Sequence, residues 1–237
     1  MPSLPEITIR CFTNDQQILD KCFYANNYQL KGFKEENERP IIVDIGSHAG
    51  FFAFSALALG AKKIYCIEPY FPNFKQLIKN TDIWEDRVAY FNYGIYTKSD
   101  TFKFNDPELQ NGMFCDYSNI DIDLDRDGLK NDVFPLSVFL QSIDEPVIDI
   151  LKISIGYAEL EILENSFILS DKIESICGET SESPERIETF KNLMKEKGYN
   201  EFYISKDPEE EKFTFLLSKT NINKHFNIKN DLSVPKP

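Results

Sequence analysis

Short apolar strands alternate with helices along much of this chain, and this alternation constrains the fold more than any other feature. Residues 41–43 are Ile-Ile-Val, a continuous β-branched run that is typical of a parallel strand buried on both faces. Residues 63–67 and 87–92 predict two further strands, and 51–59 and 72–80 predict the helices between them. Strands and helices that alternate with short links predict a parallel, doubly wound α/β sheet.

The alternation resumes in the second half of the chain, after a polar and acidic interruption at residues 96–146. We expect two more parallel strands, a helix that begins at Ser183 and Pro184, and a closing antiparallel pair of strands. The segments that carry this second half are 147–155, 159–163, 173–177, 202–205 and 213–218. The predicted fold is therefore a mostly parallel seven-stranded α/β sheet with helices on both faces and the last strand antiparallel.

The same pattern predicts the boundaries of the main domain. Residues 1–40 are expected to form an N-terminal extension with a short strand at 7–12 and a helix. Residues 41–218 form the domain itself, in which 96–146 is an excursion over the top of the sheet. Residues 219–237 are a polar tail, which we expect to be loose or to dock weakly.

The turn after the first strand carries the strongest functional signal. Asp44 ends the strand, and Gly46 and Gly50 bracket the turn, where glycine lets the backbone bend sharply and approach a ligand closely. A second acid, Glu68, ends the next strand; an acid about twenty residues after such a turn is placed to bind ribose hydroxyls. The pattern predicts a cofactor that contains a nucleoside. Asp44 would repel a pyrophosphate and suits the cationic amino-acid end of S-adenosylmethionine.

Three stretches resemble the FkbM-type methyltransferase family, and the resemblance spans about residues 41–205. They begin at Asp44, Ile64 and Ile148 and include D-I-G-S-H-A-G-F-F, I-Y-C-I-E-P and I-D-I-L-K-I. The first two are shared with many class I methyltransferases, and the third points to this family. The resemblance implies a Rossmann-like class I methyltransferase fold and methyl transfer from S-adenosylmethionine, often to a hydroxyl group of a sugar or a natural product.

The glycine turn, Glu68 and this resemblance together give a set of candidate site residues. The candidate cofactor-binding residues are Asp44, Gly46, Ser47, His48, Gly50, Glu68, Pro69, Tyr70, Asn92 and Gly94. The acceptor is expected under the 96–146 excursion, and the candidate catalytic residues beside it are Lys152, Ser154 and Glu159. Lys152 would either hold the acceptor or reach solvent from the strand end.

The third stretch departs from the family pattern, because Ser154 and Gly156 stand where the family has two acids, and Glu159 is retained. The enzyme either needs no carboxylate there, since methyl transfer depends mostly on alignment and desolvation, or it has changed acceptor. Alternatively, the chain is a catalytically inactive binding or scaffold protein. A nicotinamide oxidoreductase is disfavoured, because the glycine spacing is not G-x-G-x-x-G and the sequence has no Tyr-x-x-x-Lys pair.

The amino-acid composition limits the classes of partner and ligand that this protein is expected to bind. Lys and Arg number 26 against 39 Asp and Glu, a formal net charge of −13, which disfavours a broad nucleic-acid surface. Five scattered cysteines and two histidines predict no metal site. Residues 121–132 match part of a calcium loop, but Phe134 replaces the glutamate at its twelfth position, so an acidic loop is favoured.

The longest apolar run, 49–61, is too short to cross a bilayer, and no secretory signal is visible. We therefore expect a cytoplasmic protein, and we expect its acceptor to be a small molecule or carbohydrate.

Overall fold

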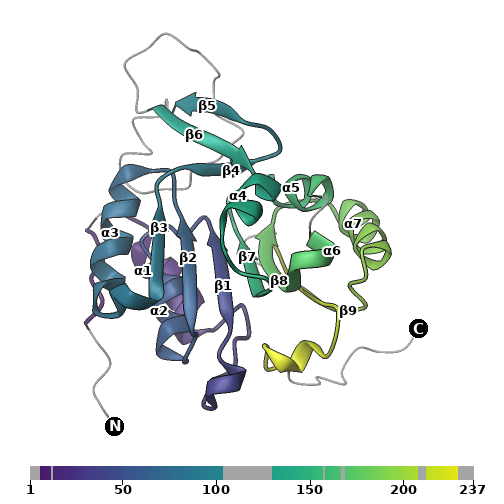
Figure 1. The fold of residues 1–237 in the computed structure, drawn as a ribbon, viewed down its shortest axis with the longest axis horizontal. Helices are drawn as coiled ribbons and strands as arrows, with labels where there is room; N and C mark the ends of the chain where they lie inside the picture. Colours follow the sequence, from purple (N-terminus) through teal and green to yellow (C-terminus); the bar gives the residue numbers. More distant parts are fainter. Residues whose placement is uncertain are drawn as a thin grey trace.

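A seven-stranded sheet forms the centre of the molecule (Figure 1). The computed structural model describes residues 6–11, 13–103, 130–156, 158–166, 169–207 and 212–228. The sheet has the order β3-β2-β1-β7-β8-β10-β9. Of these seven strands, six run in one direction and β10 runs in the opposite direction. Its strands are β1 Ile41–Ile45, β2 Lys63–Ile67, β3 Val88–Phe91, β7 Ile148–Ile153, β8 Ile173–Thr180, β9 Glu201–Lys206 and β10 Phe213–Ser218.

The predicted α/β class, the seven strands and the antiparallel last strand are confirmed. The order also separates this fold from the dinucleotide-binding fold, whose sheet has its strands in the order 3-2-1-4-5-6. Here β10, the last strand in the chain, lies between β8 and β9. The strand order therefore gives no support to the alternative that this chain is a nicotinamide oxidoreductase.

Both faces of the sheet are buried, which explains the continuous apolar runs in the central strands. Successive side chains of a strand point to opposite faces. Ile42, Ile64 and Ile150 belong to one apolar cluster, whereas their neighbours Val43 and Leu151 belong to the other. Parallel strands covered by helices on both sides need apolar residues at nearly every position.

Helices supply the two outer layers. On one face lie α2 Phe51–Ala58 and α3 Phe71–Thr81, and on the other α4 Leu136–Ser142, α5 Glu159–Asn165, α6 Leu169–Lys172 and α7 Pro184–Glu196. The helix α2 is apolar on all sides because the N-terminal extension covers the side that faces away from the sheet. Tyr28 packs edge-on against Phe52, with 5.2 Å between ring centroids, and Phe23 packs on Phe54 at 5.8 Å.

The N-terminal extension contains helices, but the expected strand is wrong. The helix α1 Asp15–Leu19 continues into a π-helix, Asp20–Tyr24. Residues 6–11 form no strand, because their polar groups are bound by side chains instead of a neighbouring strand. The amide of Thr8 donates to Oδ1 of Asn80, and Nδ2 of Asn80 donates back to the Thr8 carbonyl.

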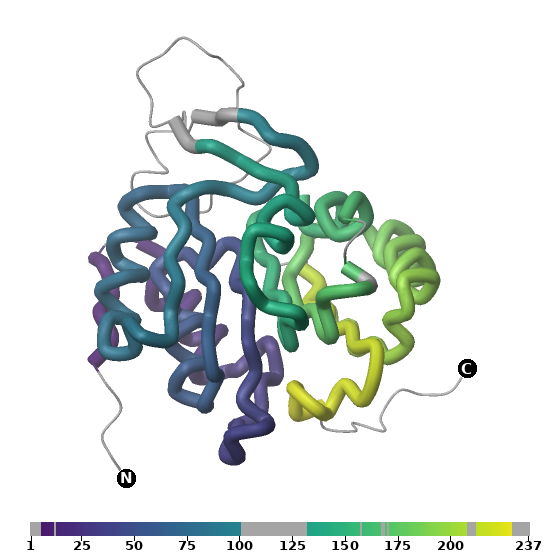
Figure 2. Tube along the Cα trace, in the orientation of Figure 1, coloured from purple at the N-terminus to yellow at the C-terminus, as the bar shows by residue number. Residues whose placement is uncertain are grey.

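The excursion contains a small sheet of its own, which lies above the main sheet in Figure 1. Its strands are β4 Gly94–Tyr96, β5 Asp100–Lys103 and β6 Lys130–Pro135, in the order β4-β6-β5. Figure 2 follows the chain from β6, in teal, down into α4, whose Phe139 and Leu140 are buried in the main core. Residues 121–129 of the partial calcium loop at 121–132 lie outside the described residues.

The segment 219–228 is docked, whereas the sequence predicted a tail that is loose or docks weakly; residues 229–237 lie outside the described residues. A short 3₁₀ helix, Ile222–Lys224, precedes His225 and Phe226, and both of these side chains are buried. Phe226 forms a β-bridge with Leu30, so the segment closes against the N-terminal extension. Apolar residues spaced within a polar stretch therefore anchor this part of the chain.

Candidate functional site

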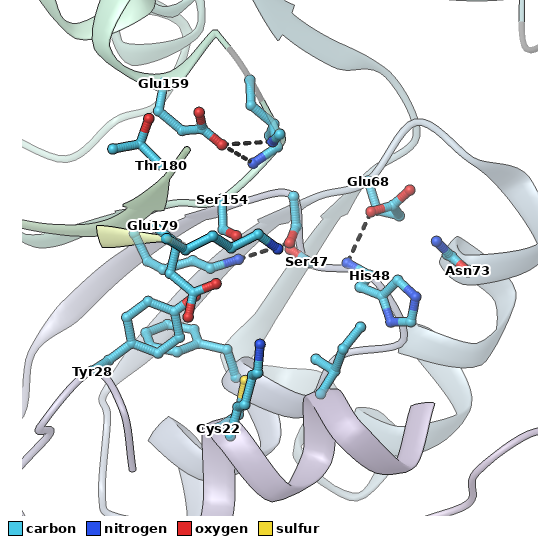
Figure 3. Close-up of a pocket in the computed structure, with 18 of the residues that line it drawn as sticks. Cys22, Tyr28, Ser47, His48, Glu68, Asn73, Ser154, Glu159, Glu179 and Thr180 are labelled. Carbon is cyan, nitrogen blue, oxygen red and sulfur yellow. Dashed lines mark hydrogen bonds between the residues drawn. The ribbon is translucent and has the colours of Figure 1, made fainter. Parts of the chain in front are cut away.

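A pocket lies at the carboxyl ends of β1, β2, β7 and β8, where open α/β sheets bind ligands (Figure 3). The N-terminal extension covers it, with Ile18, Cys22 and Tyr28 in the lining. Lys212, just before β10, also contributes. The predicted site residues that line this pocket are Gly46, Ser47, His48, Glu68, Pro69, Lys152, Ser154 and Glu159.

The loop between β1 and α2 is held against two neighbouring strands. Gly46 has φ +76°, and a Cβ there would lie 2.1 Å from the Ser154 carbonyl oxygen, so only glycine fits. The Ser47 hydroxyl donates to the Asp44 carbonyl at 2.9 Å and accepts from the Ile67 amide at 3.1 Å. These contacts fix the loop as one wall of the pocket.

His48 links this loop to the N-terminal extension. It has the left-handed φ of +52°, and its Nδ1 lies 3.9 Å from Oδ1 of Asp15. Asp15 is fully buried and receives two guanidinium bonds from Arg10, at 2.9 and 2.7 Å. Burial alone would raise the pKa of Asp15, but the bonds from Arg10 hold that pKa below its ordinary value. The extension thus approaches the loop through Asp15, whose charge is paired with Arg10.

Glu68 is the most informative residue of the pocket. Its Oε2 accepts from the His48 amide at 2.8 Å, and its Oε1 accepts from the Tyr70 amide at 2.9 Å. Burial raises the pKa of Glu68 to about 7, although these amides and the side chain of Asn73 favour the charged form. A carboxylate offers about four lone-pair sites, and the two amides and the Asn73 side chain leave capacity for one further donor. Glu68 is therefore equipped to receive a hydroxyl group.

Asp44 and Lys152 form a buried ion pair instead of two separate contacts to ligands. Lys152 Nζ lies 2.9 Å from Asp44 Oδ1, and it donates to the Gly46 carbonyl at 2.7 Å. Asp44 is fully buried and does not line the pocket; Lys152 does. Burial lowers the pKa of Lys152, but the Asp44 carboxylate outweighs it, and the net pKa is raised. The solvent-exposed alternative for Lys152 is wrong, since the residue is 4% exposed.

Ser154 and Glu159 shape the wall at the end of β7. The Ser154 amide donates to the Ile45 carbonyl at 3.1 Å. Glu159 Oε1 accepts from the amides of Ile155 at 2.7 Å and Gly156 at 2.6 Å, so this carboxylate holds the turn before α5. Burial raises the pKa of Glu159, and the backbone amides of Ile155, Glu159 and Gly156 offset this only in part.

The remaining predicted residues are not part of the pocket lining. Asn92 Nδ2 donates to the carbonyls of Glu68 at 2.9 Å and Pro69 at 3.0 Å, so it shapes the turn that carries Glu68. Tyr70 is buried at the start of α3, and Gly94 is the first residue of β4. Gly50 has φ +84° and precedes α2.

Sequence reasoning missed several lining residues as members of a site. Cys22 and Tyr28 come from the extension, Asn73 lies in the first turn of α3, and Thr180 ends β8. The spacing of Ile18 and Cys22, four residues apart, marks an apolar helix stripe but gives no sign of what the stripe covers. Asn73 carries no local signal; the fold brings it to Glu68.

Comparison with solved structures supports the fold. The human methyltransferase 10 domain containing protein aligns with a TM-score of 0.54 at 11% identity, over 91% of this chain and 89% of that one. The delta-N METTL16 MTase domain aligns with a TM-score of 0.52 at 12% identity, over 83% of this chain and 82% of that one. The chain has a Rossmann-like methyltransferase fold. No family model and no curated protein matches the sequence, so the FkbM resemblance stays a prediction.

Two further features bear on the ligands and the setting of the protein. Within the described ranges, no group of three or more His, Cys, Asp or Glu side chains is arranged to hold a metal ion. Among the same residues, no helix has both the length and the apolar character that are needed to cross a membrane.

Proposed function

We propose that this chain is an S-adenosylmethionine-dependent methyltransferase of the FkbM type that acts on a hydroxyl group of a small molecule or sugar. The observation that carries the proposal is the position of Glu68. Its carboxylate lines a pocket together with the Gly46–His48 turn, at the carboxyl ends of strands in a methyltransferase-type sheet. An acid at this place suits a ribose diol.

The residues of the pocket fit the nucleoside of this cofactor. Each oxygen of Glu68 accepts one backbone amide, and the carboxylate has capacity for a hydroxyl donor. Asn73 Oδ1 is buried and has no hydrogen-bond partner among the described residues, so it supplies one more acceptor beside Glu68. When bound, S-adenosylmethionine supplies an electrophilic methyl group.

The ion pair changes the role that we assign to Asp44. Its carboxylate is already occupied by Lys152, whose ammonium group also binds the Gly46 carbonyl. Asp44 therefore acts as a positioning residue that keeps Lys152 charged and in place. Lys152 lines the pocket, but its ammonium group already binds Asp44 and the carbonyls of Ile45 and Gly46, so its role is to hold the turn that forms the pocket wall.

The shape and charge of the molecule favour a small acceptor. The N-terminal extension covers the pocket with Cys22 and Tyr28, which are 6% and 4% exposed. A covered pocket of this kind surrounds a small ligand, whereas a polymer needs an open groove. The formal net charge of −13 also opposes a polyanionic acceptor.

Isothermal titration calorimetry with S-adenosylmethionine and then S-adenosylhomocysteine tests this proposal. We expect both ligands to bind the wild-type protein and to lose at least tenfold in affinity in Glu68→Gln, because the amide group replaces one acceptor oxygen with a donor. Glu196→Gln, an exposed change in α7, is the matched control and should bind like the wild type. Absence of binding to the wild-type protein at millimolar ligand would overturn the proposal.

A further inference from the structure

Two buried polar atoms at one end of the pocket have no hydrogen-bond partner among the described residues. They are Oε2 of Glu159 and Oγ1 of Thr180, in residues that are 1% and 2% exposed. Buried polar atoms in folded proteins are almost always paired, because an unpaired one retains its full desolvation cost. Because both residues belong to the lining of one pocket, the two unpaired atoms point to a ligand group that pairs with them.

The local structure fixes both atoms in place. Glu159 Oε1 is occupied by the amides of Ile155 and Gly156, which leaves Oε2 as the available oxygen of that carboxylate. Thr180 is the last residue of β8, and α5, which begins at Glu159, packs against this strand. In Figure 3 both side chains lie at the end of the pocket that is remote from Glu68.

The hydrogen-bonding capacity of the two free atoms indicates the kind of group that binds there. A hydroxyl group satisfies both free atoms, because it donates to a carboxylate oxygen and accepts from a threonine hydroxyl. An ammonium group has no lone pair and would leave the threonine proton unpaired.

We infer that Glu159 Oε2 and Thr180 Oγ1 form a subsite that binds a neutral hydroxyl group of the methyl acceptor, which donates to Glu159 and accepts from Thr180. This inference rests on the proposed function, since it treats the second end of the pocket as the acceptor end. The acceptor class is then a hydroxyl-bearing, uncharged molecule such as a polyol or sugar.

Crystals soaked in glycerol, with and without S-adenosylhomocysteine, provide the direct test. We expect a glycerol hydroxyl within hydrogen-bond distance of both atoms in the wild-type protein. The hydroxyl should be lost in Thr180→Val and displaced in Glu159→Gln. In the latter variant the side-chain oxygen still accepts from the Ile155 and Gly156 amides, so the turn is preserved while the free acceptor becomes a donor.

Stability supplies a second readout that does not depend on the probe. Thr180→Val removes an unpaired buried hydroxyl and should leave the Tm unchanged or raise it. Thr81→Val is the matched control and should lower the Tm, because the buried Thr81 hydroxyl bonds to the Leu77 carbonyl and to Tyr90 at 2.8 Å each.

An ordered water that glycerol does not displace from the pair would overturn the subsite. A fall in Tm for Thr180→Val as large as that for Thr81→Val would overturn it as well. If glycerol occupies the pair while S-adenosylhomocysteine fails to bind in calorimetry, the subsite stands and the proposed cofactor is wrong.

Discussion

Replacing Lys152 with methionine should be among the most destabilising changes available in this protein. Methionine keeps most of the length of the side chain but removes the charge that faces Asp44, 2.9 Å away, and the donor to the Gly46 carbonyl, 2.7 Å away. Asp44 is fully buried, so no water replaces the lost ammonium group. The variant therefore leaves an uncompensated carboxylate under the turn that forms the pocket wall.

The expected loss is about 3–5 kcal/mol, the cost of removing one partner from a buried ion pair. In a domain of this size each kcal/mol lowers the Tm by roughly 2–4 °C, so the Tm should fall by about 6–20 °C. Urea denaturation followed by circular dichroism measures the free energy of unfolding. Adding Asp44→Asn to Lys152→Met removes both charges and should recover part of the loss.

The half-exposed pair Lys191 and Glu188, 3.6 Å apart on α7, provides the control. Lys191→Met should cost less than about 1 kcal/mol, because exposed pairs contribute little. The reasoning would be refuted if Lys152→Met cost no more than this control. It would also be refuted if the losses of the Lys152 and Asp44 single variants simply added in the double variant.

Three further predictions test other parts of the account. Burial lowers the pKa of His225 to about 3, so the unfolded chain takes up this proton first as the pH falls below about 6.5. Between pH 7 and 5 the wild type should therefore lose about 2 kcal/mol of stability relative to His225→Gln in urea titrations. Gly46→Ala should abolish ligand binding and lower the Tm strongly, because its Cβ would meet the Ser154 carbonyl. Gly198→Ala is the control: its φ is also positive, at +90°, but the space around it is open, so it should cost only about 1–2 kcal/mol of stability. Because the pKa of Glu68 is raised to about 7, S-adenosylhomocysteine affinity should weaken as the pH falls below 7, a trend that calorimetry should not find in Glu68→Gln.

Local sequence patterns were sufficient for most regular elements. The predicted strand at 63–67 coincides with β2, because its apolar run is bounded by polar residues and a turn. The helix predicted from Ser183 begins as expected, and the Ser183 hydroxyl accepts from the Arg186 amide. It ends before Gly198, whose φ of +90° favours glycine. In each case the signal lies within a few residues of the element.

The partners of the site residues were not predictable in the same way. Asp44 was expected to meet a ligand, yet its partner is Lys152, more than a hundred residues away in the sequence. The cover that Cys22 and Tyr28 place over the pocket depends on how the extension packs on α2. The unpaired oxygen of Glu159 emerges only when its two backbone donors are known. Such facts depend on tertiary contacts that no local pattern encodes.

A crystal structure with S-adenosylhomocysteine would test the central claim most directly. The account predicts the ligand in the pocket between the N-terminal extension and the ends of β1, β2 and β7, with a ribose hydroxyl within hydrogen-bond distance of the Glu68 carboxylate. A complex in which the ligand binds elsewhere, or in which Glu68 makes no contact with the ribose, would contradict it.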